Sequence, residues 1–163
     1  MNFDIDKTTN VDEYFMSIAI DIAKHGSPDE VPIGAVVVYE NKVISFASNM
    51  RETDSDPTAH AEVLALRRAG IGLERWNLSD CTIYVTLEPC AMCAGAIINS
   101  RIKRLVYGAT DTRFGAINSV YNIGTDNKLN HRIEVTSGIL ESECSQLLSD
   151  FFKNIRKNKK CCE

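Results

Sequence analysis

The chain has 163 residues, is 44% hydrophobic and 25% charged, and carries a net charge of −4, which is typical of a single-domain globular protein. Its longest apolar runs, at 33–39 and 90–98, are too short to cross a membrane. Its polar, acidic N-terminus shows no signal-peptide pattern. These features exclude transmembrane, collagen-like, disordered and small disulfide-framework proteins, and we expect a cytoplasmic protein with no membrane partner.

Hydrophobic periodicity predicts the helices and strands. A capping-box-like start at Asn10 and Glu13 precedes the first helix, and Glu40-Asn41 separates two apolar runs as the turn of a β-hairpin would. In chain order we expect a helix from 11 to about 26, strands over 33–39 and 42–47, a polar loop over 49–58, a helix over 59–69 that stops at Gly70, a strand over 81–87, a helix over 90–99, strands over 105–107 and 132–135, and a final helix over 140–155.

This order of elements predicts an α/β fold. Strands joined through helical crossovers form one sheet covered by helices. We therefore expect a three-layer α/β/α sandwich with one central mixed five-stranded sheet that opens with an antiparallel hairpin. Residues 1–163 form a single predicted domain, with an ordered core at about 11–156 and a basic C-terminal tail at 157–163. The final helix has one apolar face, formed by Leu140, Cys144, Leu147, Leu148, Phe151 and Ile155.

Positive charge is concentrated at the C-terminal end of an otherwise acidic chain, on Lys153, Arg156, Lys157, Lys159 and Lys160. Such a basic segment can contact the phosphates of a nucleic acid. It can equally be a solvated helix end whose cations complement the helix dipole. Charge alone does not separate these two interpretations.

The cysteines favour metal chemistry over disulfides. Cys90 and Cys93 are three residues apart, and in a chain without a secretion signal a functional cysteine serves metal binding or catalysis. We expect Cys81, at the start of a strand, and Cys144, on the apolar helix face, to be buried free thiols. No function is assigned to Cys161–Cys162.

Three of these side chains form a predicted zinc site. Cys90 and Cys93 lie on one face at the start of a predicted helix, where the positive end of the helix dipole favours thiolates. Pro89 suits the first turn of that helix, and His60 opens the other helix after a polar loop. One histidine and two cysteines are a ligand set expected for zinc, and we expect one zinc ion per subunit.

The number of ligands distinguishes a catalytic from a structural site. Structural zinc has four protein ligands, whereas catalytic zinc leaves one position to water. His25 and His131 are poorly placed as a fourth ligand, so we favour a catalytic site. Glu62, two residues after His60, is then the expected general acid–base. Each motif alone is weak, since two cysteines meet by chance and Glu62 could be a solvated helix residue, but their conjunction is specific.

The two motifs together, H-x-E followed by P-C-x-x-C, are the signature of zinc deaminases. Over about residues 11–156 the chain closely resembles the bacterial tRNA-specific adenosine deaminases. The resemblance is carried by EVPIGAVVV at 30–38, DPTAHAE at 56–62, YVTLEPCAMCAGAII at 84–98, SRI at 100–102, VYGATD at 106–111, NHRIE at 130–134 and LSDFF at 148–152.

This resemblance implies a cytidine-deaminase-like sandwich, a homodimer and a tRNA anticodon stem-loop as partner. The implied reaction is the hydrolytic deamination of the wobble adenosine, position 34, to inosine, with Glu62 moving the proton. Substrate contacts are implied for Asn49 and Val31 against the base, for Asp111 against a neighbouring nucleotide, and for Phe152 and Arg156 against the anticodon loop. The plain alternatives are turn residues at Asn49 and Asp111, core packing at Val31 and Phe152, and a solvated cation at Arg156.

Other interpretations remain open. Arg113-Phe114-Gly115 also resembles the eukaryotic catalytic subunit, which pairs with a different chain, so a heterodimer is an alternative to the homodimer. A free nucleobase or nucleoside deaminase, acting on guanine or cytosine, would share the same zinc motifs. A non-enzymatic partner subunit with a purely structural zinc is disfavoured by the presence of Glu62, which such partners tend to lack.

Overall fold

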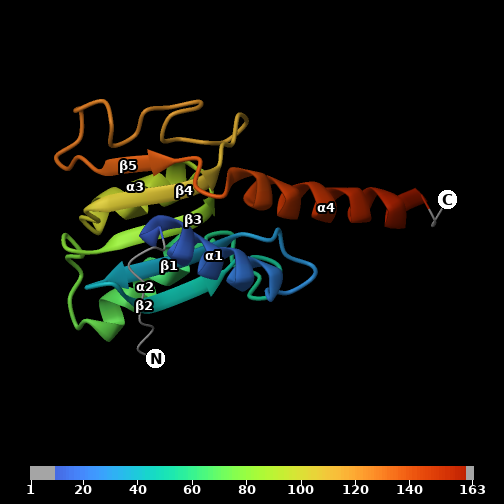
Figure 1. Cartoon of the computed structure of the whole chain (residues 1–163), viewed down its shortest axis with the longest axis horizontal. Coiled ribbons are helices and arrows are strands. Elements are labelled where there is room, and N and C mark those ends of the chain that lie inside the picture. Colours follow the sequence, from blue (N-terminus) through green and yellow to red (C-terminus); the bar gives the residue numbers. More distant parts are fainter. Residues whose placement is uncertain (1–9, 161–163) are drawn as a thin grey trace.

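The structure is a computed structural model that describes residues 10–160. These residues form one mixed β-sheet with helices packed against it. The strands lie in the order β2-β1-β3-β4-β5 (Figure 1). In chain order the elements are α1 (Val11–Lys24), β1 (Gly34–Tyr39), β2 (Lys42–Ser48), α2 (Ala61–Gly72), β3 (Thr82–Leu87), α3 (Ala91–Asn99), β4 (Arg104–Ala109), β5 (Glu134–Ser137) and α4 (Glu141–Lys160). The pair Cys161–Cys162 lies outside the described residues.

The strand directions bring two helix starts to the same edge of the sheet. β1 is antiparallel to both of its neighbours, β2 and β3, whereas β3, β4 and β5 are parallel to one another. β2 and β3 therefore point the same way, and the helices that follow them, α2 and α3, begin at the same edge. The predicted hairpin is confirmed: Glu40 and Asn41 have φ values of 49° and 57°, as a type I′ turn requires.

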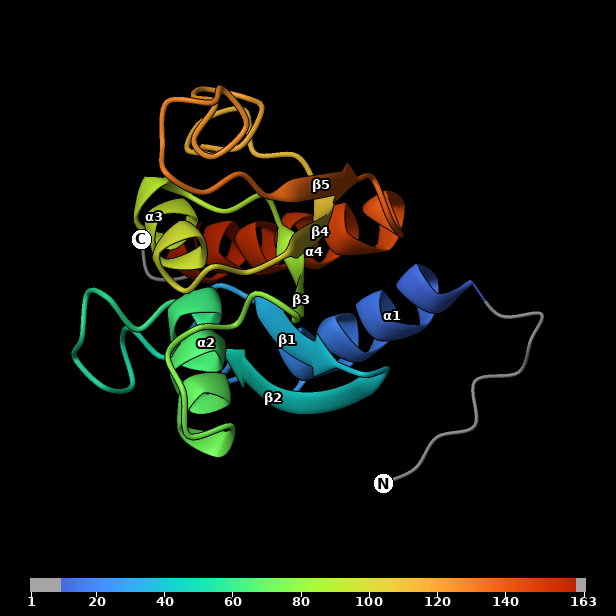
Figure 2. The same cartoon turned by 90° about the vertical axis from the view of Figure 1, so that its left-hand side faces the viewer.

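Helices cover both faces of the sheet (Figure 2). Successive side chains of a strand point to opposite faces, so Val36 and Val38 pack with α1 and α4, whereas Ala35 and Val37 pack with α2 and α3. At Gly34 a Cβ atom would lie 2.0 Å from the carbonyl oxygen of Ala19, so α1 approaches β1 closely enough to require glycine there. The predicted three-layer α/β/α sandwich with a mixed five-stranded sheet is confirmed.

Some element boundaries differ from the prediction. α2 continues through Gly70 to Gly72, because one glycine in a helix costs only about 1 kcal/mol and packing of the preceding turns offsets it. β4 is longer than predicted at both ends. β5 begins at Glu134, later than predicted, because Ile133 is buried in the core beneath α3 and donates its N–H to the carbonyl of Gly124.

The final helix is only partly packed on the body. It begins near the carboxyl end of β5, where Cys144 is buried against Gly108 of β4, and its later turns run outward past the sheet (Figure 1). Phe152 is 45% exposed and Ile155 is 37% exposed. The predicted apolar face is therefore buried in its first turns and open in its last ones, because the sheet does not extend beneath them. No helix within residues 10–160 is long and apolar enough to span a membrane.

A polar network fastens α1 to the sheet at the edge opposite the helix starts. The carboxylate of Asp12 accepts two hydrogen bonds from the guanidinium of Arg104, at 2.8 and 2.7 Å, and one from the hydroxyl of Tyr84 at 2.9 Å. Arg104 also donates to Thr136 of β5. The bonds from Arg104, together with that from Tyr84, hold the pKa of Asp12 below its ordinary value of 3.8 despite partial burial.

We predict that Asp12→Asn lowers the free energy of unfolding at pH 7 by about 2 kcal/mol, the order expected for hydrogen bonds to a charged group. Because the pKa of Asp12 is lower in the folded chain, its contribution is present above pH 3.8 and is lost as the pH falls further. Urea denaturation between pH 7 and pH 2 measures this. A difference between wild type and variant that persists undiminished at pH 2 would contradict the prediction.

Candidate active site

The first half of the site is the start of α2. His60 is the N-cap residue of this helix, but its side chain makes no capping hydrogen bond and is free to face elsewhere. The buried Asn49, which follows β2, supplies the cap instead, since its Oδ1 accepts a hydrogen bond from the N–H of Ala61 at 2.9 Å. This bond satisfies a backbone donor that the first turn of a helix leaves unpaired, and it fixes the position of His60 and Glu62.

The second half is the start of α3. β3 ends at Leu87, and three residues later Cys90 is the N-cap of α3, with the buried Cys93 in its first turn. The side chain of Cys90 makes no capping hydrogen bond to this helix. The positive end of the helix dipole therefore acts directly on the two sulfur atoms. Pro89 precedes the helix without an N–H that would need a partner.

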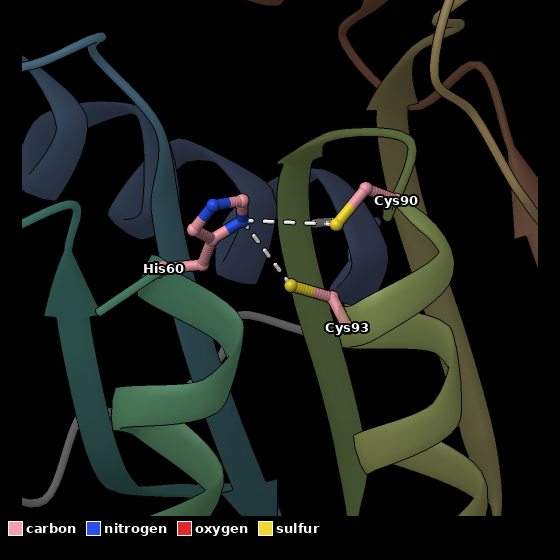
Figure 3. A group of neighbouring side chains, drawn as sticks. All are labelled: His60, Cys90 and Cys93. Atoms are coloured by element: carbon pink, nitrogen blue, oxygen red, sulfur yellow. Dashed lines mark hydrogen bonds between the residues drawn. The ribbon is translucent and has the colours of Figure 1, made fainter. Parts of the chain in front are cut away.

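Three ligand atoms meet between the two helix starts. The imidazole of His60 faces both thiols (Figure 3), with its Nδ1 3.7 Å from the Sγ of Cys90 and 3.5 Å from the Sγ of Cys93. All three atoms lie within 4.8 Å of one another. A nitrogen and two sulfurs at this spacing can hold a metal ion, as predicted from the motifs, and among the described residues no other His, Cys, Asp or Glu joins this cluster.

Hydrogen bonding couples the protonation of the two thiols to each other and to His60. Hydrogen bonding from Cys93, then from His60, lowers the pKa of Cys90 to about 4 despite burial. The same bond to Cys90, together with burial and the nearby Glu62 carboxylate, raises the pKa of Cys93. The thiolate of Cys90 in turn raises the pKa of His60. A divalent ion bound between these side chains would stabilise both sulfurs as thiolates.

Glu62 is buried beside this cluster with an unsatisfied oxygen. Its side chain is 3% exposed, so it is not the solvated helix residue considered as an alternative. Burial raises its pKa, and the negative charge of Cys90 adds to this effect. Within the described residues, its Oε2 is the buried side-chain oxygen or nitrogen that lacks a hydrogen-bond partner. A buried polar atom without a hydrogen-bond partner lowers the stability of the fold. We therefore infer that this oxygen interacts with a ligand or carries a proton.

The other predicted site residues fall into two groups. Val31 and Asn49 belong to the segments before β1 and after β2, and Asp111 follows β4 at the edge where α2 and α3 begin. Phe152 and Arg156 lie four residues apart on α4 and are both exposed. Phe152 is therefore not a core residue, and its ring contacts that of Phe151 with centroids 5.3 Å apart.

Asn49 and Asp111 each accept hydrogen bonds from backbone N–H groups, as expected if they were turn residues with no contact to the substrate. The Oδ1 of Asp111 accepts hydrogen bonds from the N–H groups of Arg113 and Phe114, at 2.9 and 3.1 Å. The Oδ1 of Asn49 is taken by Ala61. Each side chain retains a second polar atom, Nδ2 of Asn49 and Oδ2 of Asp111, that forms no hydrogen bond within residues 10–160.

Two buried glutamates near the site were not predicted. Glu30 is 4% exposed and accepts hydrogen bonds from the N–H groups of Glu52 and Thr53 in the loop before His60. Glu88 is 2% exposed and accepts hydrogen bonds from the loop after β4. The sequence signal that could have predicted their burial is an acidic residue in an otherwise largely apolar block. Glu30 begins the block EVPIGAVVV, and Glu88 lies within the block YVTLEPC.

Comparisons with known proteins agree with this site. A family model described as MafB19-like deaminase matches residues 9–156. The tRNA-specific adenosine deaminase of Haemophilus influenzae is 50% identical over 151 residues, which cover 91% of this chain and 87% of that protein. The tRNA-specific adenosine deaminase of Bacillus subtilis is 46% identical over 150 residues, covering 91% of this chain and 93% of that protein. The chain belongs to the tRNA-specific adenosine deaminases.

Solved structures place this deaminase in the predicted cytidine-deaminase-like fold. A structure from a study of A-to-I editing by tRNA:A34 deaminases at the wobble position of transfer RNA superimposes with a TM-score of 0.79 at 43% identity, covering 83% of this chain and 99% of that one. A guanine deaminase from Nitrosomonas europaea superimposes with a TM-score of 0.74 at 27% identity, covering 85% of this chain and 83% of that one. Free-base deaminases thus share the scaffold at lower identity.

We predict that the purified deaminase contains about one divalent metal ion per chain, and that Cys93→Ala loses it because a three-ligand site tolerates no further loss. Cys81→Ala is the matched control, since Cys81 is also a buried free cysteine but lies outside the cluster. Elemental analysis of the wild type and the two variants measures the metal content. Retention of the metal by Cys93→Ala, or its equal loss from both variants, would contradict the assignment.

Proposed function

We propose that this protein is a zinc-dependent hydrolase that deaminates the wobble adenosine, position 34, of a tRNA anticodon loop to inosine. The observation that carries the proposal is the buried, unpaired carboxyl group of Glu62 beside the three-ligand cluster. The same arrangement stands in a chain that is 50% identical to a tRNA-specific adenosine deaminase over nearly its whole length. We propose residues 1–163 as a single domain for this activity, working in the cytoplasm.

The ligands fit zinc. A tetrahedral zinc ion with Zn–S bonds of about 2.3 Å and Zn–N bonds of about 2.0 Å separates the nitrogen and the sulfur by about 3.5 Å, which is close to the distances between His60 and the two cysteines. Three protein ligands are the number found in catalytic zinc sites. When bound, zinc activates a water molecule for attack by lowering its pKa to about 7.

Glu62 is placed to move the proton. Hydrolysis adds the oxygen of water to C6 of adenine and releases the amino group as ammonia, so one proton of the water must reach a ring nitrogen and the other must reach the leaving amino group. The raised pKa of the Glu62 carboxyl brings it closer to neutrality, where a general acid–base exchanges its proton most effectively. Its unpaired Oε2 lies beside the metal ligands and is free for this role.

The remaining residues are proposed to hold the RNA. The free Nδ2 of Asn49, just after β2, can donate a hydrogen bond to the base, and Val31, in the segment before β1, can provide an apolar contact. The free Oδ2 of Asp111 can accept one from a neighbouring nucleotide. On α4, the exposed Phe152 offers a stacking surface and Arg156 a phosphate contact on the same helix face, which is a combination suited to single-stranded nucleic acid.

The homodimer is likewise proposed from the family to which the chain belongs. Sedimentation equilibrium of the purified chain distinguishes it from a monomer, and a monomer that requires a second, different chain for activity would favour the heterodimer. The alternative substrate, a free base such as guanine or cytosine, is supported by the likeness to a guanine deaminase at 27% identity. Identity to the tRNA-specific relatives is higher, and free bases would not require the exposed, basic α4.

We predict that the wild-type protein forms inosine in an anticodon stem-loop bearing adenosine at position 34, and that Glu62→Gln lowers kcat by about 10²- to 10⁴-fold while the metal content is unchanged. Glu74→Gln, the same change at an exposed residue just after α2, is the matched control and keeps full activity. Nucleoside analysis of the digested RNA measures inosine. Deamination of free guanine or cytosine with no change in the stem-loop would overturn the proposal.

A second prediction concerns α4. Arg156→Ala should raise KM for the stem-loop and reduce the slope of log affinity against log salt concentration by about one, because one phosphate contact is lost. Phe152→Ala should raise KM with little change in that slope, because a stacking contact carries no charge. Lys42→Ala, an exposed cation at the opposite edge of the sheet, serves as the control. Unchanged KM values in both α4 variants would remove this helix from the RNA interface.

A further inference from the structure

The buried carboxylate of Glu88 accepts hydrogen bonds from several residues of the loop that follows β4. Its Oε1 accepts hydrogen bonds from the N–H groups of Ile117, Asn118 and Ser119, at 3.2, 2.8 and 3.0 Å. Its Oε2 accepts one from the N–H of Asp111 at 3.1 Å and one from the hydroxyl of Ser119. The donors all belong to residues 111–119, which we call the Asp111 loop. This segment contains no helix or strand, and five of its hydrogen bonds are donated to Glu88.

The position of Glu88 joins this loop to the metal ligands. Glu88 directly follows β3 and stands two residues before Cys90. Its own N–H donates to the carbonyl of Ala109, the last residue of β4, and the N–H of Ala116 donates to the carbonyl of Pro89 at 2.8 Å. The Asp111 loop is thus bonded to both residues that precede a predicted zinc ligand. Displacement of one would displace the other.

The fit between the carboxylate and the loop is tight. A Cβ atom at Gly115 would lie 2.4 Å from Oε2 of Glu88 and 2.4 Å from the carbonyl oxygen of Asp111, so the loop closes on Glu88 without room for a side chain. The loop directs only hydrogen-bond donors at the two carboxylate oxygens, four backbone N–H groups and one hydroxyl, so it is shaped to hold a carboxylate.

We propose that Glu88 is a positioning residue that sets the place of Asp111 relative to the metal cluster, and thereby the binding of the nucleotide beside the target adenosine. This inference rests on the proposed function. Asp111 is held from two sides, by its N–H to Glu88 and by its Oδ1 to Arg113 and Phe114. Its Oδ2 is left to face a ligand. Glu88 itself does not contact the RNA, because its side chain is 2% exposed and both of its oxygens are occupied by the loop.

The substitution Glu88→Gln separates this role from a general loss of structure. A glutamine can keep one oxygen on the three N–H groups of residues 117–119, but it places an NH2 group opposite the N–H of Asp111, where two donors face each other. We expect KM for the stem-loop to rise about tenfold, the order of one hydrogen bond to a charged group, while kcat changes less than twofold and the metal content is unchanged.

Two further variants act as controls. Ser119→Ala removes the hydroxyl contact but leaves the Asp111 N–H bonded to Glu88, so KM should stay within about twofold of the wild type. Gly115→Ala keeps Glu88 and pushes the loop away from it, so it should reproduce the rise in KM with unchanged metal content. Gly115→Ala also serves as the test if Glu88→Gln does not fold.

A double-mutant cycle decides whether Glu88 acts through Asp111. In an Asp111→Ala background, Glu88→Gln should raise KM by less than about twofold, because the group that it positions is already absent. The inference is overturned if Glu88→Gln leaves KM unchanged, if it lowers kcat together with the metal content, or if its effect is undiminished without Asp111. A wild-type protein that forms no inosine in the stem-loop would instead refute the proposed function itself.

Discussion

The site depends on the meeting of two helix amino termini at one edge of the sheet. β2 and β3 are parallel because both are antiparallel to β1, which lies between them. The helices that follow these strands must therefore start side by side, with His60 at one start and Cys90 and Cys93 at the other. Both helix dipoles point their positive ends at this place and favour thiolates. A metal ion can thus be held by ligands from two distant segments without any dedicated loop.

Three buried glutamates around this edge have different surroundings and, as we propose, different roles. Glu30 and Glu88 accept hydrogen bonds from backbone N–H groups of the loops on either side of the site, and these bonds hold the two loops in place. Glu62 retains an oxygen without a partner, and burial raises its pKa. The same side chain is a structural anchor where backbone donors surround it and a proton carrier where they are missing. Environment, not residue type, separates the two uses.

The chemistry of the cluster and the choice of substrate reside in different parts of the molecule. The three ligands and Glu62 would serve any deaminase of this fold, and a guanine deaminase shares that fold at 27% identity. The features that fit an RNA lie outside the cluster: the exposed outer turns of α4 and the Asp111 loop. α4 and the Asp111 loop both begin at the carboxyl edge of the parallel strands. The nucleotides that flank one bound at the cluster would therefore lie within reach of these two segments.

The amino-acid sequence alone determined the order of the elements and pointed to His60, Cys90, Cys93 and Glu62 as a candidate metal site, because periodicity and helix-start motifs are local patterns in the chain. It did not determine that α2 passes through Gly70, that β5 starts after Ile133, or that Phe152 is exposed, since each depends on which surfaces the sheet covers. Nor did it show that Glu30 and Glu88 are buried. A carboxylate can be buried only where backbone donors converge on it, and these donors come from loops that only the folded chain brings together.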